Sequence, residues 1–298
     1  MAIKTVKVEI NGVQHTLEYN NETGKWEKTL SAPNITSYNK EGGYYPVTVT
    51  ATNEAGTEST LTPADNENLK LIVKERIKPV ITLLTPSDGA YISNSLQPIS
   101  FTVTDEISGS GVNADSITVK IDGTEITTIT KNAISNGFNC TCTPASALSD
   151  GSHSLEIIAN DNDGNSADTV ESTFTVDTIP PVLNITSPQN NMVTASKTIT
   201  VSGVTNDITS SPVVLNVEVN SVDNGTVTVN DDGTFSKNIT LQEGINEVIV
   251  TATDLAGKTT TITLDITLDT SVPVISNISI VPNPVDAGAT MLISVEVE

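Results

Sequence analysis

The sequence has very few histidine, cysteine and aromatic residues. Its 298 residues include two histidines, two cysteines and one tryptophan, and aromatic residues make up 3% of the chain. Few aromatic side chains are therefore left to form the platforms on which sugar-binding modules hold their ligands. The scarcity also limits the groups that could serve catalysis or metal binding.

Long apolar segments are missing as well. No apolar run approaches the ~20 residues that a membrane-spanning helix needs. The first residues contain no apolar segment typical of a signal peptide. We therefore expect no membrane insertion, and a protein made in the cytoplasm without a signal peptide.

The two cysteines, Cys140 and Cys142, are separated by a single residue. That spacing places both side chains on one face of a strand. A disulfide between them would be strained, and a metal site would need two further ligands that are not nearby. We expect two free thiols.

Candidate catalytic groups do not converge. His15 and His153 fall in different units of the chain, and each is expected to be a surface residue rather than a general base. No nucleophile-elbow, phosphate-loop or dinucleotide-binding motif occurs. A carboxylate pair could serve a glycosidase, but the aspartates stand in repeated turns where Asn53 replaces one of them. The sequence predicts that the protein is not an enzyme.

The charge is strongly negative, with a formal net charge of −22. Such a surface repels nucleic acid and anionic lipid, so we expect no nucleic-acid partner. Solubility explains the charge, and attraction to divalent cations or basic partners is the alternative. Thr, Val and Ile dominate the composition, which favours strands over helices.

An internal repeat organises the chain. Three segments align without gaps, and each is an alternating strand that ends in an Asn/Asp-x-x-Gly turn: residues 47–56, 155–164 and 248–257. Their final glycines are 108 and 93 residues apart, which is the size of one β-sandwich domain. Strict alternation indicates strands with one buried and one wet face.

Prolines mark the domain boundaries. A Pro-Val pair stands at Pro79, Pro181 and Pro273, at the start of three successive units, and proline belongs in a linker or at the start of an edge strand. The fold class predicted is all-β, with tandem immunoglobulin-like β-sandwiches in an extended array and a C-terminal two-strand segment. The predicted domains are residues 1–76, which lack the opening strands, 77–178, 179–271 and the partial unit 272–298.

These motifs resemble bacterial Ig-like domains. The third unit fits best, through Ile185-Thr-Ser-Pro188, Asp232-Gly-Thr-Phe235 and Gly244-Ile-Asn-Glu-Val248. In the first unit, Gly42-Gly-Tyr-Tyr-Pro-Val-Thr-Val49 is similar to Ig-like domains of Gram-positive phage tail proteins. The resemblance implies a sandwich fold over nearly the whole chain. It is compatible with cell-wall adhesins, accessory modules of secreted carbohydrate enzymes and phage tail proteins.

The two ends of the sequence look complementary. The first unit begins at its third strand, and residues 272–298 match the first two strands of a unit. Eight apolar side chains there are candidates for inter-chain assembly: Val274, Ile275, Ile278, Ile280, Met291, Ile293, Val295 and Val297. Donation of these strands to an incomplete domain of another chain is one hypothesis. A longer parent protein and a harmless tail are the alternatives.

An acidic loop and a group of aromatic residues are two further candidate sites. Asp161, Asp163, Asn165 and Asp168 resemble an oxygen-rich calcium loop, but Ser166 and Ser172 stand where glycine and glutamate would be expected. A hairpin turn explains the same stretch, and no cofactor is expected beyond this calcium candidate. One aromatic group is assigned to core packing of the first unit rather than to a binding patch: Trp26, Tyr38, Tyr44 and Tyr45.

The function expected is a non-enzymatic structural protein of a phage tail or tail-like particle, located outside the cell as part of that particle. Its expected partners are other structural proteins of the particle, further copies of itself through the C-terminal strands, and the host cell-wall surface. The alternative is a fragment of a cell-surface adhesin or stalk, or a non-catalytic module of a secreted enzyme.

Overall fold

The computed structural model describes residues 2–298 and is all-β, as predicted. Its helices are three short 3-10 turns, Glu41–Gly43, Glu67–Leu69 and Ala114–Ser116. Within the described chain, no helix has the length and apolarity to cross a membrane. The chain falls into two compact units, Met1–Val176 and Asp177–Glu298, so each is described by itself.

The C-terminal part of the first unit is a two-sheet sandwich. One sheet has the order β13-β14-β10-β8: Ile129–Ile134, Gly137–Cys142, Ile99–Thr104 and Val80–Thr85. The other has the order β12-β11-β15-β16-β9: Thr124–Glu125, Thr118–Ile121, Gly151–Ile158, Val170–Val176 and Ala90–Ile92. Phe101 on β10 and Phe174 on β16 lie fully buried in its core.

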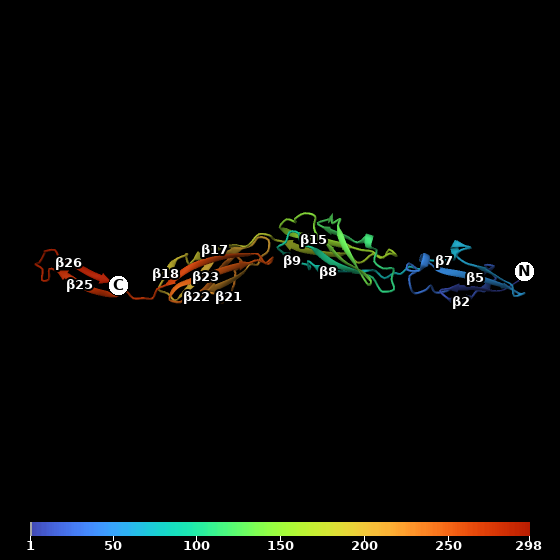
Figure 1. The fold of residues 1–298 in the computed structure, drawn as a ribbon, viewed down its shortest axis with the longest axis horizontal. Helices are drawn as coiled ribbons and strands as arrows, with labels where there is room; N and C mark the ends of the chain where they lie inside the picture. The colour runs from blue at the N-terminus through green and yellow to red at the C-terminus, as the bar shows by residue number, and fades with distance from the viewer. Residues whose placement is uncertain (1) are drawn as a thin grey trace. The chain divides into compact units, whose positions relative to one another are not determined.

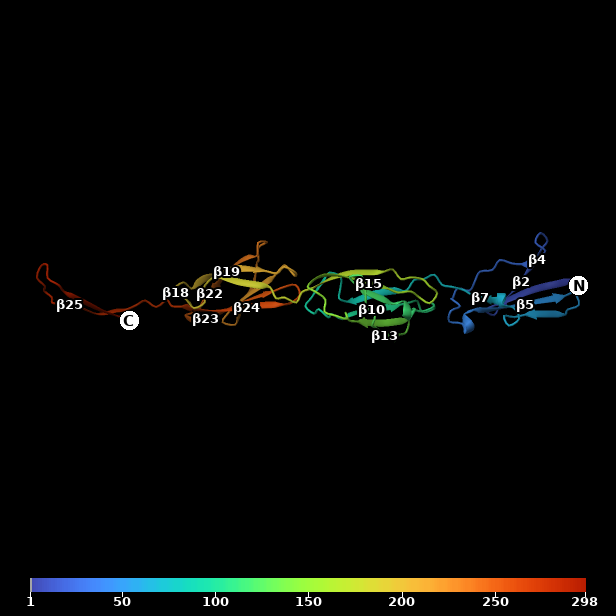
Figure 2. The ribbon, with the colours of Figure 1, turned by 90° about the horizontal axis from the view of Figure 1, so that it is seen from above.

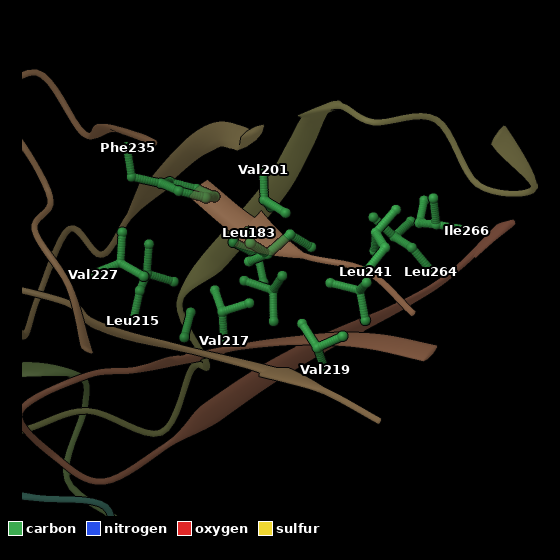
Figure 3. Close-up of a cluster of buried hydrophobic side chains, with 14 of the residues drawn as sticks. Leu183, Val201, Leu215, Val217, Val219, Val227, Phe235, Leu241, Leu264 and Ile266 are labelled. Carbon is green, nitrogen blue, oxygen red and sulfur yellow. The ribbon is translucent and has the colours of Figure 1, made fainter. Parts of the chain in front are cut away.

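The second unit repeats this sandwich. One sheet has the order β17-β19-β22: Val182–Ser187, Thr198–Asn206 and Thr234–Thr240. The other has the order β18-β24-β23-β20-β21: Met192–Thr194, Thr259–Leu268, Gly244–Thr253, Val214–Val219 and Val222–Val227. Figure 3 shows the side chains of both sheets, among them Val201, Leu215 and Phe235, gathered in one apolar cluster.

Alternation along each strand decides which side chains enter these cores. On β20, Leu215, Val217 and Val219 are buried, whereas Val214 at the start of the strand is exposed. Side chains along a strand point to opposite faces of the sheet, so every second residue is taken out of water. Full burial of one such side chain contributes about 1.5–3 kcal/mol.

The N-terminal part of the first unit contains one of these two sheets. Its order is β2-β1-β5-β6, with β7 also paired to β5: Val13–Thr16, Ile3–Ile10, Tyr45–Asn53, Glu58–Leu61 and Lys70–Leu71. It corresponds to the β12-β11-β15-β16 sheet of the following domain. Among the described residues, this part has no counterpart of the β10-β8 pair, and its buried hydrophobic residues are Val6, Val8 and Tyr45. It is therefore an open sheet rather than a closed sandwich.

The aromatic residues of this part do not form one core, which corrects the expectation for three of them. Tyr38 is exposed, and Tyr44 is only half-buried. Trp26 lies on a separate hairpin of β3 (Glu18–Asn20) and β4 (Lys25–Glu27), where its ring centroid is 5.6 Å from that of Tyr19 (Figure 2). Tyr45 alone of the four is buried, and its hydroxyl donates to the Ile35 carbonyl at 3.1 Å.

The two cysteines are free and buried, as predicted. Both lie on β14 and face the core, with Cys140 opposite Phe101 and Cys142 opposite Ile99 on β10. Burial, together with the neighbouring Cys140 thiol, raises the pKa of Cys142 to about 11. Neither thiol is therefore an activated nucleophile.

The expectation that His153 is a surface residue is wrong. His153 lies on β15, is buried, and packs its ring 5.6 Å from that of Phe174. Its Nδ1 is 2.7 Å from Asp122 Oδ2, and its Nε2 is 2.8 Å from the Ser149 carbonyl oxygen. Both partners are acceptors, so both ring nitrogens donate and the imidazolium form is favoured.

These contacts set the pKa of both partners. Burial lowers the pKa of His153, but hydrogen bonds to Asp122 and Ser149 outweigh it, so the pKa is raised above 6.5. Burial raises the pKa of Asp122, but hydrogen bonds from His153 and the Ser154 amide outweigh it, so the pKa is lowered below 3.8. The pair is a structural ion pair between the buried His153 and the exposed Asp122.

The last two strands stand apart from any core. β25 (Ile275–Val281) and β26 (Leu292–Val297) pair with each other in a two-stranded sheet (Figure 1). The eight apolar side chains singled out from the sequence are 40% to 66% exposed. No described residue covers either face, so the hairpin presents its apolar side chains to water.

Leu215→Ala tests the alternation of β20. We expect this substitution to lower the free energy of unfolding of the second unit by about 2–5 kcal/mol, because it leaves a cavity in a packed core. Val214→Ala on the same strand is the control and should change it by about 0.5 kcal/mol or less. Urea unfolding followed by circular dichroism measures both. Equal effects of the two substitutions would contradict the assigned faces.

Asp122→Asn tests the ion pair with His153. The stabilisation from His153 is complete below pH 6.5 and is lost as the pH rises through its raised pKa. The stabilisation from Asp122 is present above pH 3.8 and is lost as the pH falls through the lowered pKa of its carboxyl group. The variant should therefore be least stable, relative to the parent chain, between those pH values. Denaturation at several pH values measures this, with Asp168→Asn as a control whose effect should not follow that profile.

Candidate functional site

Asn/Asp side chains close the repeated turns in the same way. Asn53, Asp161 and Asp254 each accept a hydrogen bond through Oδ1 from the amide four residues later, at 2.9, 2.7 and 2.8 Å. The glycine at the third following position has a positive φ in every copy. An aspartate is thus not needed for the turn itself, since Asn53 makes the same bond. This agrees with the structural role predicted for these residues.

The residues of the predicted calcium loop have other partners. Asp161 Oδ2 accepts from the Asn165 side chain at 2.6 Å. Asp163 Oδ2 accepts from Thr36 Oγ1 at 2.5 Å and from the Glu75 amide at 3.1 Å. Asp168 is exposed and pairs with Lys78 Nζ at 2.6 Å. The structure does not gather these carboxylates into one group, and a calcium site in this loop stays a prediction.

Carboxylates do gather at two other places, each beside a linker. The Glu75 cluster consists of Glu75, Asp105 and Glu106, and the Asp177 cluster consists of Asp177, Asp207 and Asp254. In each cluster, one oxygen from every side chain lies within 4.8 Å of the others. Both therefore concentrate three negative groups in a small volume.

The Glu75 cluster lies at the start of the second Ig-like fold. Glu75 comes from the linker before β8, whereas Asp105 and Glu106 directly follow β10. The Ser110 amide donates to Glu75 Oε1, and the Gly111 amide donates to Asp105 Oδ2 at 2.7 Å. Three further oxygens are buried without a hydrogen-bond partner: Glu75 Oε2, Asp105 Oδ1 and Glu106 Oε2.

The Asp177 cluster lies at the corresponding place in the second unit. Asp177 comes from the linker before β17, Asp207 follows β19 and Asp254 follows β23. Their exposed fractions are 0%, 7% and 6%. Each Oδ1 accepts a hydrogen bond from a backbone amide: Asp177 from Ile179 at 3.1 Å, Asp207 from Thr209 at 2.8 Å and Asp254 from Lys258 at 2.8 Å. Asp254 Oδ2 is buried and has no partner.

No positive side chain neutralises either cluster. The four ion pairs among the described residues involve Glu67, Asp168, Glu156 and Asp122 as their acidic partners. Two like charges at this separation repel by about 3–4 kcal/mol at an effective dielectric constant near 20. Burial, together with the adjacent carboxyl groups of Glu75 and Asp105, raises the pKa of Glu106 to about 8. A proton relieves part of the repulsion, and a cation would relieve more.

Sequence reasoning missed both clusters, although a signal exists. An acidic residue precedes each linker proline by four positions: Glu75 before Pro79, Asp177 before Pro181 and Asp269 before Pro273. The loops after β10 and β19 also share an Asp/Glu-Ile pair, in which Ile107 and Ile208 are 95% and 96% exposed. Only the fold brings linker and loop together, so the pairing could not be read from the sequence.

Polar contacts also join the first two parts of the first unit. Asn39 Nδ2 donates to the Gly109 carbonyl at 2.7 Å, and Lys74 Nζ donates to the Asp163 carbonyl at 3.0 Å. Thr36 and the Glu75 amide donate to the Asp163 carboxylate, as described above. The linker around residue 75 is therefore tied to the loops of the domain that follows it.

Two known families match parts of the chain. Residues 78–178 match the family described as bacterial Ig-like domain, and residues 181–270 match domain B of glucodextranase. Bacillopeptidase F of Bacillus subtilis (strain 168) is 30% identical over 206 residues, which is 64% of this chain. The chain spans only 14% of the length of that relative.

Solved structures of tandem domains are also similar. The fibronectin(III)-like modules of Clostridium thermocellum CbhA are 17% identical, with a TM-score of 0.43, over 63% of this chain and 93% of theirs. Immunoglobulin domains 1–5 of Sidekick-1 are 14% identical, with a TM-score of 0.37, over 99% of this chain and 60% of theirs. Residues 78–178 are therefore similar to bacterial Ig-like domains, and the fold of the chain is that of tandem Ig-like β-sandwiches.

Proposed function

We propose that this chain is a non-catalytic spacer of a bacterial protein exposed outside the cytoplasm, in which Ig-like domains hold other parts at a set distance. The observation that carries the proposal is the hydrogen-bonded junction at Asp163. Its carboxylate receives a hydrogen bond from Thr36 in the preceding domain and one from the linker amide of Glu75. A junction fixed in this way limits the freedom that a plain linker would leave.

The relatives support this setting. Bacillopeptidase F is by its name a peptidase, and glucodextranase by its name an enzyme. The matching residues of this chain nevertheless form Ig-like β-sandwiches, and the glucodextranase match is to its domain B alone. Because this chain spans 14% of the peptidase, its likeness extends to a part of that protein only. A spacer that separates or presents a catalytic region can occur in proteins of different activities, which is consistent with the same fold matching both of them.

Assembly of a particle is the second candidate function, and the exposed hairpin favours it. β25 and β26 correspond to the β8–β10 pair, the pair for which the open β2-β1-β5-β6 sheet has no described counterpart. Their apolar side chains and open edges suit strand donation to an incomplete Ig-like domain. The particle envisaged is a phage tail or tail-like structure, with the host cell wall as a further partner.

Asp163→Ala tests the spacer. Spin labels at Leu61→Cys and Leu84→Cys report the distance between the two domains of the first unit, because the native thiols are buried. We expect a narrow distance distribution in the parent chain and a broader one in the variant, measured by pulsed electron paramagnetic resonance. Asp168→Ala is the matched control and should leave the distribution narrow. A broad distribution in the parent chain, or hydrolysis of a peptide or glucan by the chain, would refute the spacer.

Removal of residues 272–298 tests assembly. If the hairpin donates strands, the whole chain should form concentration-dependent oligomers in sedimentation velocity, and the shortened chain should be monomeric. Ile293→Asp should weaken association by a factor of about ten or more, since it places a charge on the apolar face. The exposed Asp286→Asn serves as the control. A whole chain that stays monomeric at high concentration would exclude self-assembly through the hairpin.

A further inference from the structure

We propose that the Glu75 cluster and the Asp177 cluster each bind one calcium ion. The proposal concerns residues outside the loop at positions 161–168, and it does not depend on the spacer function. Two independent places in the chain carry the same arrangement, in which one acidic residue comes from a linker and another from the loop after the second long strand. A repeated arrangement is hard to attribute to chance contacts between acidic side chains.

Unpartnered buried oxygens are the first reason. Asp105 is 5% exposed and its Oδ1 has no partner, and Asp254 is 6% exposed and its Oδ2 has no partner. Buried polar atoms in folded proteins almost always have a hydrogen-bond partner or a ligand. Each of these oxygens belongs to a side chain of a three-carboxylate group, so a cation at the group would provide the missing partner.

Space kept open beside the carboxylates is the second reason. A Cβ atom on Gly109 would lie 2.7 Å from Asp105 Oδ2, 2.7 Å from Glu75 Oε2 and 2.8 Å from the Glu106 side chain. The φ of Gly109 is not in the left-handed region, so its backbone conformation does not require glycine. A Cβ atom there would displace the ends of the three acidic side chains, so glycine permits their close approach.

The donor atoms select the kind of ion. Both groups offer carboxylate oxygens and no nitrogen or sulfur ligand, which disfavours zinc. Calcium accepts six to eight oxygen ligands in flexible geometry, whereas magnesium demands near-ideal octahedral coordination and retains several waters. The three side chains of each cluster come from two or three separate segments, which suits the less demanding ion. Dissociation constants of about 10⁻⁴–10⁻³ M are typical of extracellular calcium modules.

The turn at Asp254 allows a conservative test. Asp254→Asn keeps the Oδ1 that accepts from the Lys258 amide, and Asn53 makes that same bond in the first repeat. The variant thus removes one negative charge while retaining the turn. Asp269→Asn is the matched control, because Asp269 is the exposed linker acid of the next repeat, and it accepts from the Ser271 amide as Asp177 does from Ile179.

The experiment is isothermal titration of the whole chain with calcium chloride after removal of metal by a chelator. We expect two sites in the parent chain, and thermal unfolding at a higher temperature with calcium than without. Asp254→Asn should leave the site at the Glu75 cluster unchanged. It should weaken calcium binding at the Asp177 cluster by roughly tenfold or more. Asp207→Asn is a second variant of the Asp177 cluster and should have the same effect there. Glu106→Gln and Gly109→Ala should weaken binding at the Glu75 cluster instead. Asp269→Asn should retain both sites.

The outcomes separate the two clusters. A site that survives the substitutions of one cluster overturns the assignment to that cluster. The absence of both a heat of binding and calcium-dependent unfolding at millimolar calcium would overturn the whole proposal. Since the titration reads metal binding alone, its result is independent of the distance measurements that test the spacer.

Discussion

Pairing of two sheets across an apolar layer is the constraint on which the chain depends. Each strand buries only alternate side chains, so one sheet cannot remove its apolar face from water without a second sheet opposite it. The domains with cores at Phe101 and Leu215 have both sheets. The open sheet near the N-terminus and the β25–β26 hairpin each have one layer, and both consequently expose apolar residues.

Local patterns were sufficient to predict the strands. Alternation depends on neighbours in sequence, and so do tight turns such as Asn11-Gly12 and Asp122-Gly123, in which both residues have a positive φ. The free thiols followed from the same periodicity. His153 was misplaced because its burial depends on Asp122, a residue 31 positions away that supplies the charge needed to keep an imidazolium inside.

The acidic clusters were beyond sequence reasoning for a related reason. Glu75 and Asp105 are 30 positions apart, and Asp177 and Asp254 are 77 apart, so their proximity is a property of the sandwich and not of any motif. The loop at Asp161 was predicted as a calcium site because its oxygen-bearing residues are close in sequence. In the fold those oxygens are occupied by amide donors, while the distant carboxylates retain unpartnered oxygens.

The buried thiols on β14 have a consequence for the oxidation chemistry of this domain. While the sandwich is closed, Cys140 and Cys142 are shielded from solvent and their pKa values are raised by burial, so dissolved oxidants have little access to a thiolate. Opening of the β14–β10 pair would expose both at once. Oxidation of either thiol therefore requires this sandwich to open first.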